Sequence, residues 1–225
     1  MNTRVKVYGS SISIKVNNIY CVGKNYADHR KEMGDDSAPE EPVIFLKPNS
    51  SIVTNGGKIE FPKFKGKDIS TDMHYEAEFV IVIGKDCHNI DKSKAFEYIY
   101  GYAVGIDMTL RDIQSTAKKN GLPWTVSKGF YTSAPLSDII QSPSIQKPQN
   151  VSFRLELNGQ TVQKGNTNDM IHYIDELIEY ISSVFYLKSG DIIFTGTPAG
   201  VGSVKKGDTL KAYLGNFITL EVKVN

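Results

Sequence analysis

The sequence predicts a β-rich α+β fold in a single domain that spans residues 1–225. Three observations predict it: short runs of β-branched and aromatic residues recur between turn residues, helical periodicity is confined to a few segments, and strands do not alternate regularly with helices. A length of 225 residues suits one large domain or two small ones, and no repeat or change of composition marks a linker. The lack of βα alternation argues against a doubly wound sheet.

Five runs are the strongest candidates for strands. Each is bounded by Gly, Asn, Asp or Pro, which are residues typical of turns. The five runs are residues 43–46, 78–83, 151–157, 191–195 and 217–222. Asn158-Gly159 follows the third run and predicts a two-residue hairpin turn.

Helices are expected in fewer places. The clearest covers residues 169–185, where apolar side chains at helical spacing form one face and Asn168 or Asp169 can cap the start. Shorter helices are expected at residues 91–98, 109–119 and 26–33.

Composition excludes several classes of function. Lys and Arg number 26 against 25 Asp and Glu, so no broad charged surface is expected for nucleic acid or an anionic membrane. Cys21 and Cys87 lie far apart, which argues against a disulfide framework and a structural zinc site. The first residues lack a signal peptide, and the longest apolar runs, of about five residues, are far shorter than a membrane span. We expect a soluble, cytoplasmic protein with a small-molecule partner.

Two glutamates stand at the start of a strand that is apolar on both faces. Alternate side chains of a strand share a face, so Glu76 and Glu78 are expected to point the same way. Buried carboxylates need paired cations or a metal ion, because desolvation costs several kcal/mol per charge. The alternative is that the strand emerges into water here and both glutamates are solvated.

A third carboxylate, Asp107, ends the apolar run at residues 102–106. If Asp107 lies beside the glutamates, the three side chains offer oxygen ligands that suit Mg²⁺, Mn²⁺ or Ca²⁺ and disfavour zinc. The alternative is that Asp107 caps a helix that begins at Thr109.

Three further features could serve such a site. Lys128 offers a cation, although most lysines are solvated. The glycine-rich loop at residues 195–202 lacks the ending of a Walker A motif but can present N–H groups and a threonine hydroxyl to a carboxylate; a plain turn is the alternative. His29 and Glu32 would be neighbours on a helix and could form an acid–base dyad, or only a surface contact.

Taken together, these segments resemble the fumarylacetoacetate hydrolase family, in its small branch of acylpyruvases and oxaloacetate decarboxylases. The similarity follows the same order along almost the whole chain. It includes residues 22–29, 42–48, 74–78, 105–114, 128–130, 158–159, 190–193 and 195–202. The resemblance implies a mixed β-sandwich or β-roll fold and a homodimer.

The resemblance also implies roles for particular residues. Glu76, Glu78 and Asp107 would hold a Mg²⁺ or Mn²⁺ ion, with Ca²⁺ as a non-productive occupant. His29 and Glu32 would belong to a lid and prepare a water molecule, and Lys128 would face the substrate. The other positions that match the pocket are Arg111, Gln114, Thr197 and Lys47.

The function predicted from these features is divalent-metal-dependent C–C bond cleavage of acylpyruvates or related 2-oxo acids, through a metal-stabilised enolate. The substrate would be a small 2-oxo or 2,4-dioxo acid, and oxaloacetate decarboxylation is possible at the same site. One alternative is an isomerase or decarboxylase of a 2-oxo dioate from aromatic catabolism. Another is a metal-binding β-rich module without catalysis.

Overall fold

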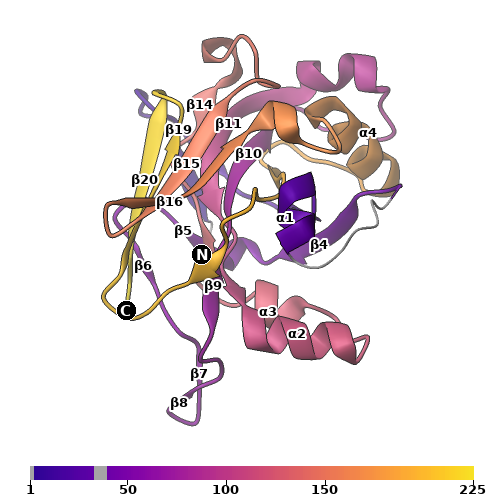
Figure 1. Ribbon diagram of the computed structural model, residues 1–225. Helices are drawn as coiled ribbons and strands as arrows, with labels where there is room; N and C mark the ends of the chain where they lie inside the picture. Colours follow the sequence, from indigo (N-terminus) through magenta and orange to yellow (C-terminus); the bar gives the residue numbers. More distant parts are fainter. Residues whose placement is uncertain (1–2, 33–39) are drawn as a thin grey trace.

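Two mixed β-sheets pack face to face in the computed structural model, which describes residues 3–32 and 40–225 (Figure 1). In spatial order, the first sheet contains β14 (Ile140–Gln141), β11 (Ile99–Ile106), β10 (Ala77–Ile83), β17 (Ile192–Phe194), β3 (Ile19–Gly23) and β4 (Val43–Lys47). The second contains β16 (Gln160–Asn166), β15 (Ser152–Leu157), β19 (Thr209–Leu214), β20 (Ile218–Val224) and β6 (Lys58–Ile59). This arrangement confirms the predicted β-rich α+β class and the mixed sandwich.

Parallel pairing occurs once in each sheet. β17 pairs in parallel with β3, and β20 pairs in parallel with β6, whereas the other neighbours within the two sheets are antiparallel. The antiparallel pair of β10 and β11 is central to the first sheet, and its end positions the site described below.

The core fills the space between the two sheets. Phe79 and Ile81 of β10 meet side chains of the second sheet, such as Leu155 of β15, and all three are fully buried. Val80 and Val82 point to the opposite face of β10, where a second apolar cluster covers them. The strand is therefore buried on both faces, as its sequence predicts.

Smaller elements surround the sandwich. A three-stranded sheet contains β12 (Thr109–Leu110), β9 (Met73–Tyr75) and β18 (Gly202–Ser203), in that order. The two-stranded sheets are β1 (Arg4–Lys6) with β2 (Ser13–Lys15), β13 (Ala134–Pro135) with β5 (Ile52–Val53), and β7 (Lys63–Phe64) with β8 (Lys67–Asp68). The α-helices are α1 (Ala27–Glu32), α2 (Arg111–Lys119), α3 (Thr125–Lys128) and α4 (Ile174–Val184). The 3₁₀ turns are η1 (Asn49–Ser51), η2 (Lys92–Tyr98), η3 (Ser142–Ser144) and η4 (Thr167–Asp169).

All five predicted strands are present. They correspond to β4, β10, β15, β17 and β20, with ends that shift by one or two residues. The hairpin prediction is also confirmed, because Asn158 and Gly159 join β15 to β16 and both have positive φ angles, 51° and 82°.

The start of the longest helix was predicted too early. α4 begins at Ile174, because Asn168 and Asp169 belong to the separate 3₁₀ turn η4. The residue before the helix is Tyr173, whose N–H donates to the Glu176 carboxylate at 3.1 Å. The first N–H of α4, that of Ile174, donates to the Gln149 side chain at 3.0 Å, so neither Asn168 nor Asp169 caps this helix.

The shorter helices also differ from the prediction. Thr109 and Leu110 form β12, which pairs with β9, so α2 begins only at Arg111. Of the predicted 91–98, residues 92–98 form the 3₁₀ turn η2, which Asp91 caps by accepting from Ser93 N–H at 2.9 Å. α1 covers residues 27–32 of the predicted 26–33, and Met33 lies outside the described residues. Over the described ranges, no helix is long and apolar enough to span a membrane.

Candidate active site

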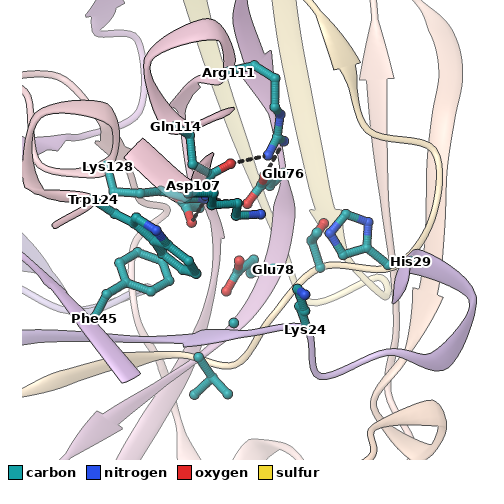
Figure 2. A pocket seen from close by; sticks show the side chains of 14 residues that line it. Lys24, His29, Phe45, Glu76, Glu78, Asp107, Arg111, Gln114, Trp124 and Lys128 are labelled. Atoms are coloured by element: carbon teal, nitrogen blue, oxygen red, sulfur yellow. Dashed lines mark hydrogen bonds and ion pairs between the residues drawn. The ribbon is translucent and has the colours of Figure 1, made fainter. Parts of the chain in front are cut away.

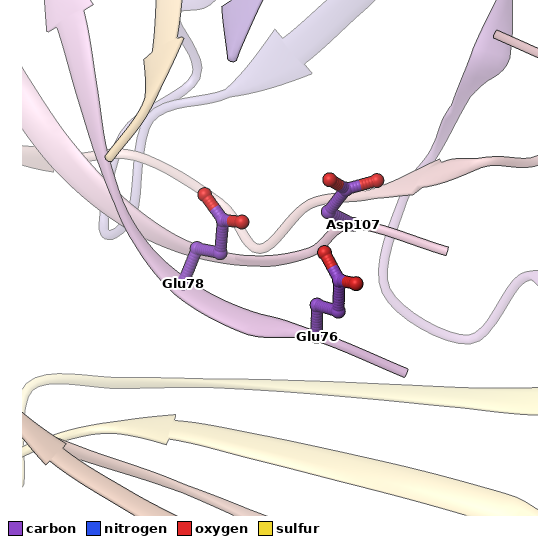
Figure 3. Close-up of side chains that lie close together, drawn as sticks. All are labelled: Glu76, Glu78 and Asp107. Atoms are coloured by element: carbon purple, nitrogen blue, oxygen red, sulfur yellow. The ribbon is translucent and has the colours of Figure 1, made fainter. Parts of the chain in front are cut away.

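The register between β10 and β11 brings three carboxylates together. Ala77 lies opposite Ile106, so Glu76, just before β10, lies beside Asp107, just after β11. The Asp107 N–H donates to the Glu76 carbonyl at 2.8 Å. Glu78, two residues after Glu76, points to the same side (Figure 3).

These three side chains could share one ion. One carboxylate oxygen from each lies within 4.8 Å of the others. Glu76, Glu78 and Asp107 are only 5%, 2% and 1% exposed, so the alternative of solvated glutamates is wrong. The helix-cap alternative for Asp107 is also wrong, because Leu110 occupies the cap position of α2.

Three buried cations compensate the carboxylates. The Lys128 ammonium lies 2.6 Å from Glu76 and 2.6 Å from Asp107. The Lys47 ammonium lies 2.8 Å from the second Asp107 oxygen, and the Arg111 guanidinium pairs with Glu76. Lys128, at the end of α3, and Lys47, at the end of β4, are each 3% exposed. The sequence alternative of a solvated Lys128 is therefore wrong.

The surroundings shift the pKa values of Glu76 and Glu78 in opposite directions. Burial raises the pKa of Glu76, but the charges of Lys128 and Arg111 outweigh burial and hold that pKa well below its usual range. Burial, together with the negative charges of Asp107 and Glu76, raises the pKa of Glu78 well above its usual range. Burial lowers the pKa of Lys128, but the Asp107 and Glu76 carboxylates raise it further, so its net pKa is elevated. The site therefore holds the proton of Lys128 more firmly, and Glu78 binds a proton more tightly than an ordinary glutamate does.

The glycine-rich loop directs one N–H at the carboxylates. The Gly196 N–H donates to Glu78 at 2.7 Å. Gly196 has a φ of 99°, and a Cβ there would lie 2.7 Å from the Asn25 Cβ, so the close approach requires glycine. The Thr197 hydroxyl donates to the Ala77 carbonyl at 2.8 Å and lies in the pocket wall. The loop thus meets a carboxylate of the protein itself, and it is more than a plain turn.

His29 and Glu32 form the contact that their spacing predicts. His29 Nδ1 lies 3.1 Å from a Glu32 carboxylate oxygen, and His29 is 6% exposed. Glu32 also accepts from the Gly200 N–H, at 3.1 and 3.3 Å to its two oxygens. The glycine-rich loop therefore holds Glu32, and Glu32 in turn orients the imidazole of His29.

A pocket lies over the carboxylates (Figure 2). Its lining includes eight of the ten predicted site residues: His29, Glu76, Glu78, Asp107, Arg111, Gln114, Lys128 and Thr197. Lys47 and Glu32 are not part of the lining. Lys47 lies behind Asp107 and donates to the Lys128 and Met108 carbonyls, and Glu32 lies behind His29.

Sequence reasoning assigned no role to the six other lining residues. The four with long or aromatic side chains are Lys24, Phe45, Lys118 and Trp124. Figure 2 shows Phe45 and Trp124 on one side of the carboxylates, with Lys24 and His29 on the other. One signal was available: Lys118 follows Arg111 and Gln114 at helical spacing, which places the three on one face of α2.

The donor set fits a hard divalent cation. The three side chains offer only oxygen atoms, and the residues described around them contribute no histidine or cysteine to the cluster.

Comparison with known proteins supports the family resemblance. Residues 18–225 match the family described as fumarylacetoacetate (FAA) hydrolase, C-terminal. The chain is 50% identical to the mitochondrial oxaloacetate decarboxylase of Dictyostelium discoideum, over 86% of each protein. It is 48% identical to the mitochondrial oxaloacetate tautomerase of Arabidopsis thaliana, over 86% of this chain and 84% of that protein. A crystal structure of fumarylpyruvate hydrolase from Pseudomonas aeruginosa, in complex with Mn²⁺ and pyruvate, superposes with a TM-score of 0.93 at 34% identity, over 99% of this chain and 95% of that one.

Proposed function

We propose that this chain, which belongs to the fumarylacetoacetate hydrolase family, is an enzyme that breaks a C–C bond of acylpyruvates or related 2-oxo acids through an enolate. The observation that carries the proposal is the buried cluster of Glu76, Glu78 and Asp107 at the base of a pocket lined by Lys128 and Arg111. The relatives support it, because their names describe reactions of oxaloacetate and fumarylpyruvate. Oxaloacetate decarboxylation or tautomerisation would use the same enolate.

Glu76, Glu78 and Asp107 would hold one Mg²⁺ or Mn²⁺ ion; the bound Mn²⁺ of the fumarylpyruvate hydrolase supports a divalent ion. Such an ion supplies Lewis-acid polarisation of the 2-oxo group and stabilises the negative charge of the enolate. A homodimer and a cytoplasmic location stay predictions of the sequence.

The charges of the site favour anionic substrates. In the metal-loaded site, three ionised carboxylates balance the three cations Lys47, Lys128 and Arg111. A divalent ion therefore leaves the loaded site with two surplus positive charges, which favour a 2-oxo acid over a neutral ketone. Arg111 and Gln114 are held together at 2.6 Å and would orient the substrate carboxylate from the pocket wall.

His29 and Glu32 would prepare the water that attacks the distal carbonyl of an acylpyruvate. When Nδ1–H donates to Glu32, the unprotonated Nε2 is free to accept a proton from water. Glu32 then stabilises the imidazolium that forms. Decarboxylation of oxaloacetate adds no water, so it does not need this proton transfer.

Replacing His29 with Ala is expected to impair acylpyruvate hydrolysis without impairing metal binding. We expect acetylpyruvate hydrolysis to fall by about 10²- to 10⁴-fold, the usual contribution of a general base, while the affinity for Mn²⁺ stays within about twofold. Steady-state kinetics and calorimetric Mn²⁺ titration measure the two quantities. An unchanged rate of hydrolysis would rule out the dyad.

Metal binding is expected to release a proton from Glu78. The raised pKa of Glu78, caused by burial and by Asp107 and Glu76, favours the protonated form of the cation-free site. Because a bound cation requires the ionised carboxylate, the affinity for Mn²⁺ should rise with pH, by up to about tenfold per unit, and level off above that raised pKa. Calorimetry in two buffers of different ionisation enthalpy detects the proton. Glu78→Gln is the control that should lose proton release, and equal heats for the wild type in both buffers would contradict the expectation.

A substrate panel tests the proposed function directly. Acetylpyruvate, fumarylpyruvate and oxaloacetate are each incubated with the protein and Mg²⁺ or Mn²⁺, and pyruvate release is followed. Turnover of at least one of them, dependent on the ion, is the expected result. No pyruvate from any of the three with either ion would reject the proposed C–C bond cleavage, and a further lack of keto–enol conversion of oxaloacetate would favour a non-catalytic module.

A further inference from the structure

An aromatic wall connects the base of the pocket to its mouth, with an ammonium at each end. The Lys128 ammonium lies 5.1 Å from the centre of the Phe45 ring. Phe45 contacts Trp124 edge-on, with ring centres 5.8 Å apart. The Lys118 ammonium lies 5.2 Å from the centre of the Trp124 ring. Lys128 is buried, whereas Lys118 is exposed, so the wall runs from the carboxylates towards solvent.

The mouth of the pocket is positively charged. Lys118 and Lys24 both line it, and the acids among the described lining residues are the three at the base. Partial desolvation of the Lys118 ammonium, followed by the charges of Lys24, Arg111 and Lys128, lowers its pKa, and Glu76 opposes this effect. An anion placed between Lys118 and the base would relieve this repulsion.

Helix α2 presents two kinds of polar contact to the same cavity. Arg111 and Gln114 lie near its start, beside Glu76, and Lys118 lies one turn further towards the end. Lys119, the next residue, is also exposed but does not line the pocket. Lys118 therefore lines the pocket, whereas the neighbouring Lys119 does not.

We propose that Lys118 recognises a second carboxylate, at the end of the substrate distant from the 2-oxo group, while Phe45 and Trp124 pack against the chain between the two carboxylates. This inference rests on the proposed function and deepens it: a planar, unsaturated 2,4-dioxo acid with a terminal carboxylate suits the site better than a short monocarboxylate. The wall favours a flat carbon chain, because aromatic faces pack well against conjugated planes.

Paired substrates and paired variants test the inference. Fumarylpyruvate carries the distal carboxylate and acetylpyruvate lacks it. Lys118→Met removes the charge and keeps the length of the side chain, and Lys119→Met is the matched control. We expect Lys118→Met to raise KM for fumarylpyruvate about tenfold and to leave acetylpyruvate kinetics within about twofold. Lys119→Met should change neither, and Lys118→Arg should keep most of the preference.

The other outcomes overturn the inference in distinguishable ways. Equal effects of Lys118→Met on both substrates would show that Lys118 stabilises the fold or binds the 2-oxo acid end that both substrates share. No effect on either substrate would show that the distal carboxylate is bound elsewhere. If the wild type releases pyruvate from oxaloacetate but from neither of these two compounds in Mg²⁺ or Mn²⁺, this inference fails and the proposed function stands; release from none of the three rejects both.

Discussion

Replacing Glu78 with Gln is expected to reduce turnover on the order of 10³-fold without unfolding the protein. In the described part of the chain, the Glu78 carboxylate forms no ion pair and accepts from the Gly196 N–H at 2.7 Å. The Gln carbonyl oxygen can accept the same hydrogen bond, and no buried cation loses its partner. The charge that a divalent ion requires is nevertheless lost.

Two measurements check this prediction. Pyruvate release from acetylpyruvate at saturating Mn²⁺ should fall as stated, and the free energy of unfolding in urea, without added metal, should stay within about 1 kcal/mol of wild type. Wild-type turnover in the variant would mean that Glu78 is not a ligand. A loss of activity that merely follows a loss of folded protein would also contradict the prediction.

Replacing Asp107 with Ala is expected to damage stability as well as activity. Its two oxygens pair with two buried lysines, Lys47 at 2.8 Å and Lys128 at 2.6 Å. Removal of one partner from a buried ion pair costs about 3–5 kcal/mol, because the other charge stays desolvated. The free energy of unfolding should therefore fall by that amount, and metal-dependent turnover should be abolished.

A double variant tests whether an unpaired buried lysine causes this destabilisation. Combining Asp107→Ala with Lys47→Met removes one of the stranded charges, so part of the lost stability should return while activity stays absent. A single Asp107→Ala variant that is within about 1 kcal/mol of wild type would show that the lysines find water or other partners, and would contradict the ion-pair account.

The elements that could be predicted are those whose sequence pattern is local. The apolar residues on both faces of β10 predict a buried strand, and the alternation in that strand predicts that Glu76 and Glu78 share a direction. The start of α2 could not be predicted, because Thr109 and Leu110 have no local signal for strand; they form β12 only because β9 is available for pairing. Tertiary pairing decided the structure there.

The site could be predicted less well than the strands from local sequence patterns. Asp107 joins the glutamates through the register of β10 and β11, and Lys47 and Lys128 arrive from elements far away in the chain. Without the family resemblance, no spacing distinguishes these two lysines from the solvated ones. Lys118 is different, because its helical spacing from Arg111 and Gln114 is local, but that spacing identifies a shared face and not a pocket.

The dependence of pyruvate release on a bound divalent ion is the decisive test of the carboxylate site. The protein is stripped with EDTA, dialysed, and titrated with Mn²⁺ while acetylpyruvate cleavage is followed. We expect no measurable turnover before Mn²⁺ is added and full activity once one ion per chain is bound. The Glu78→Gln variant should not recover activity. Full activity of the wild type in excess EDTA would contradict it.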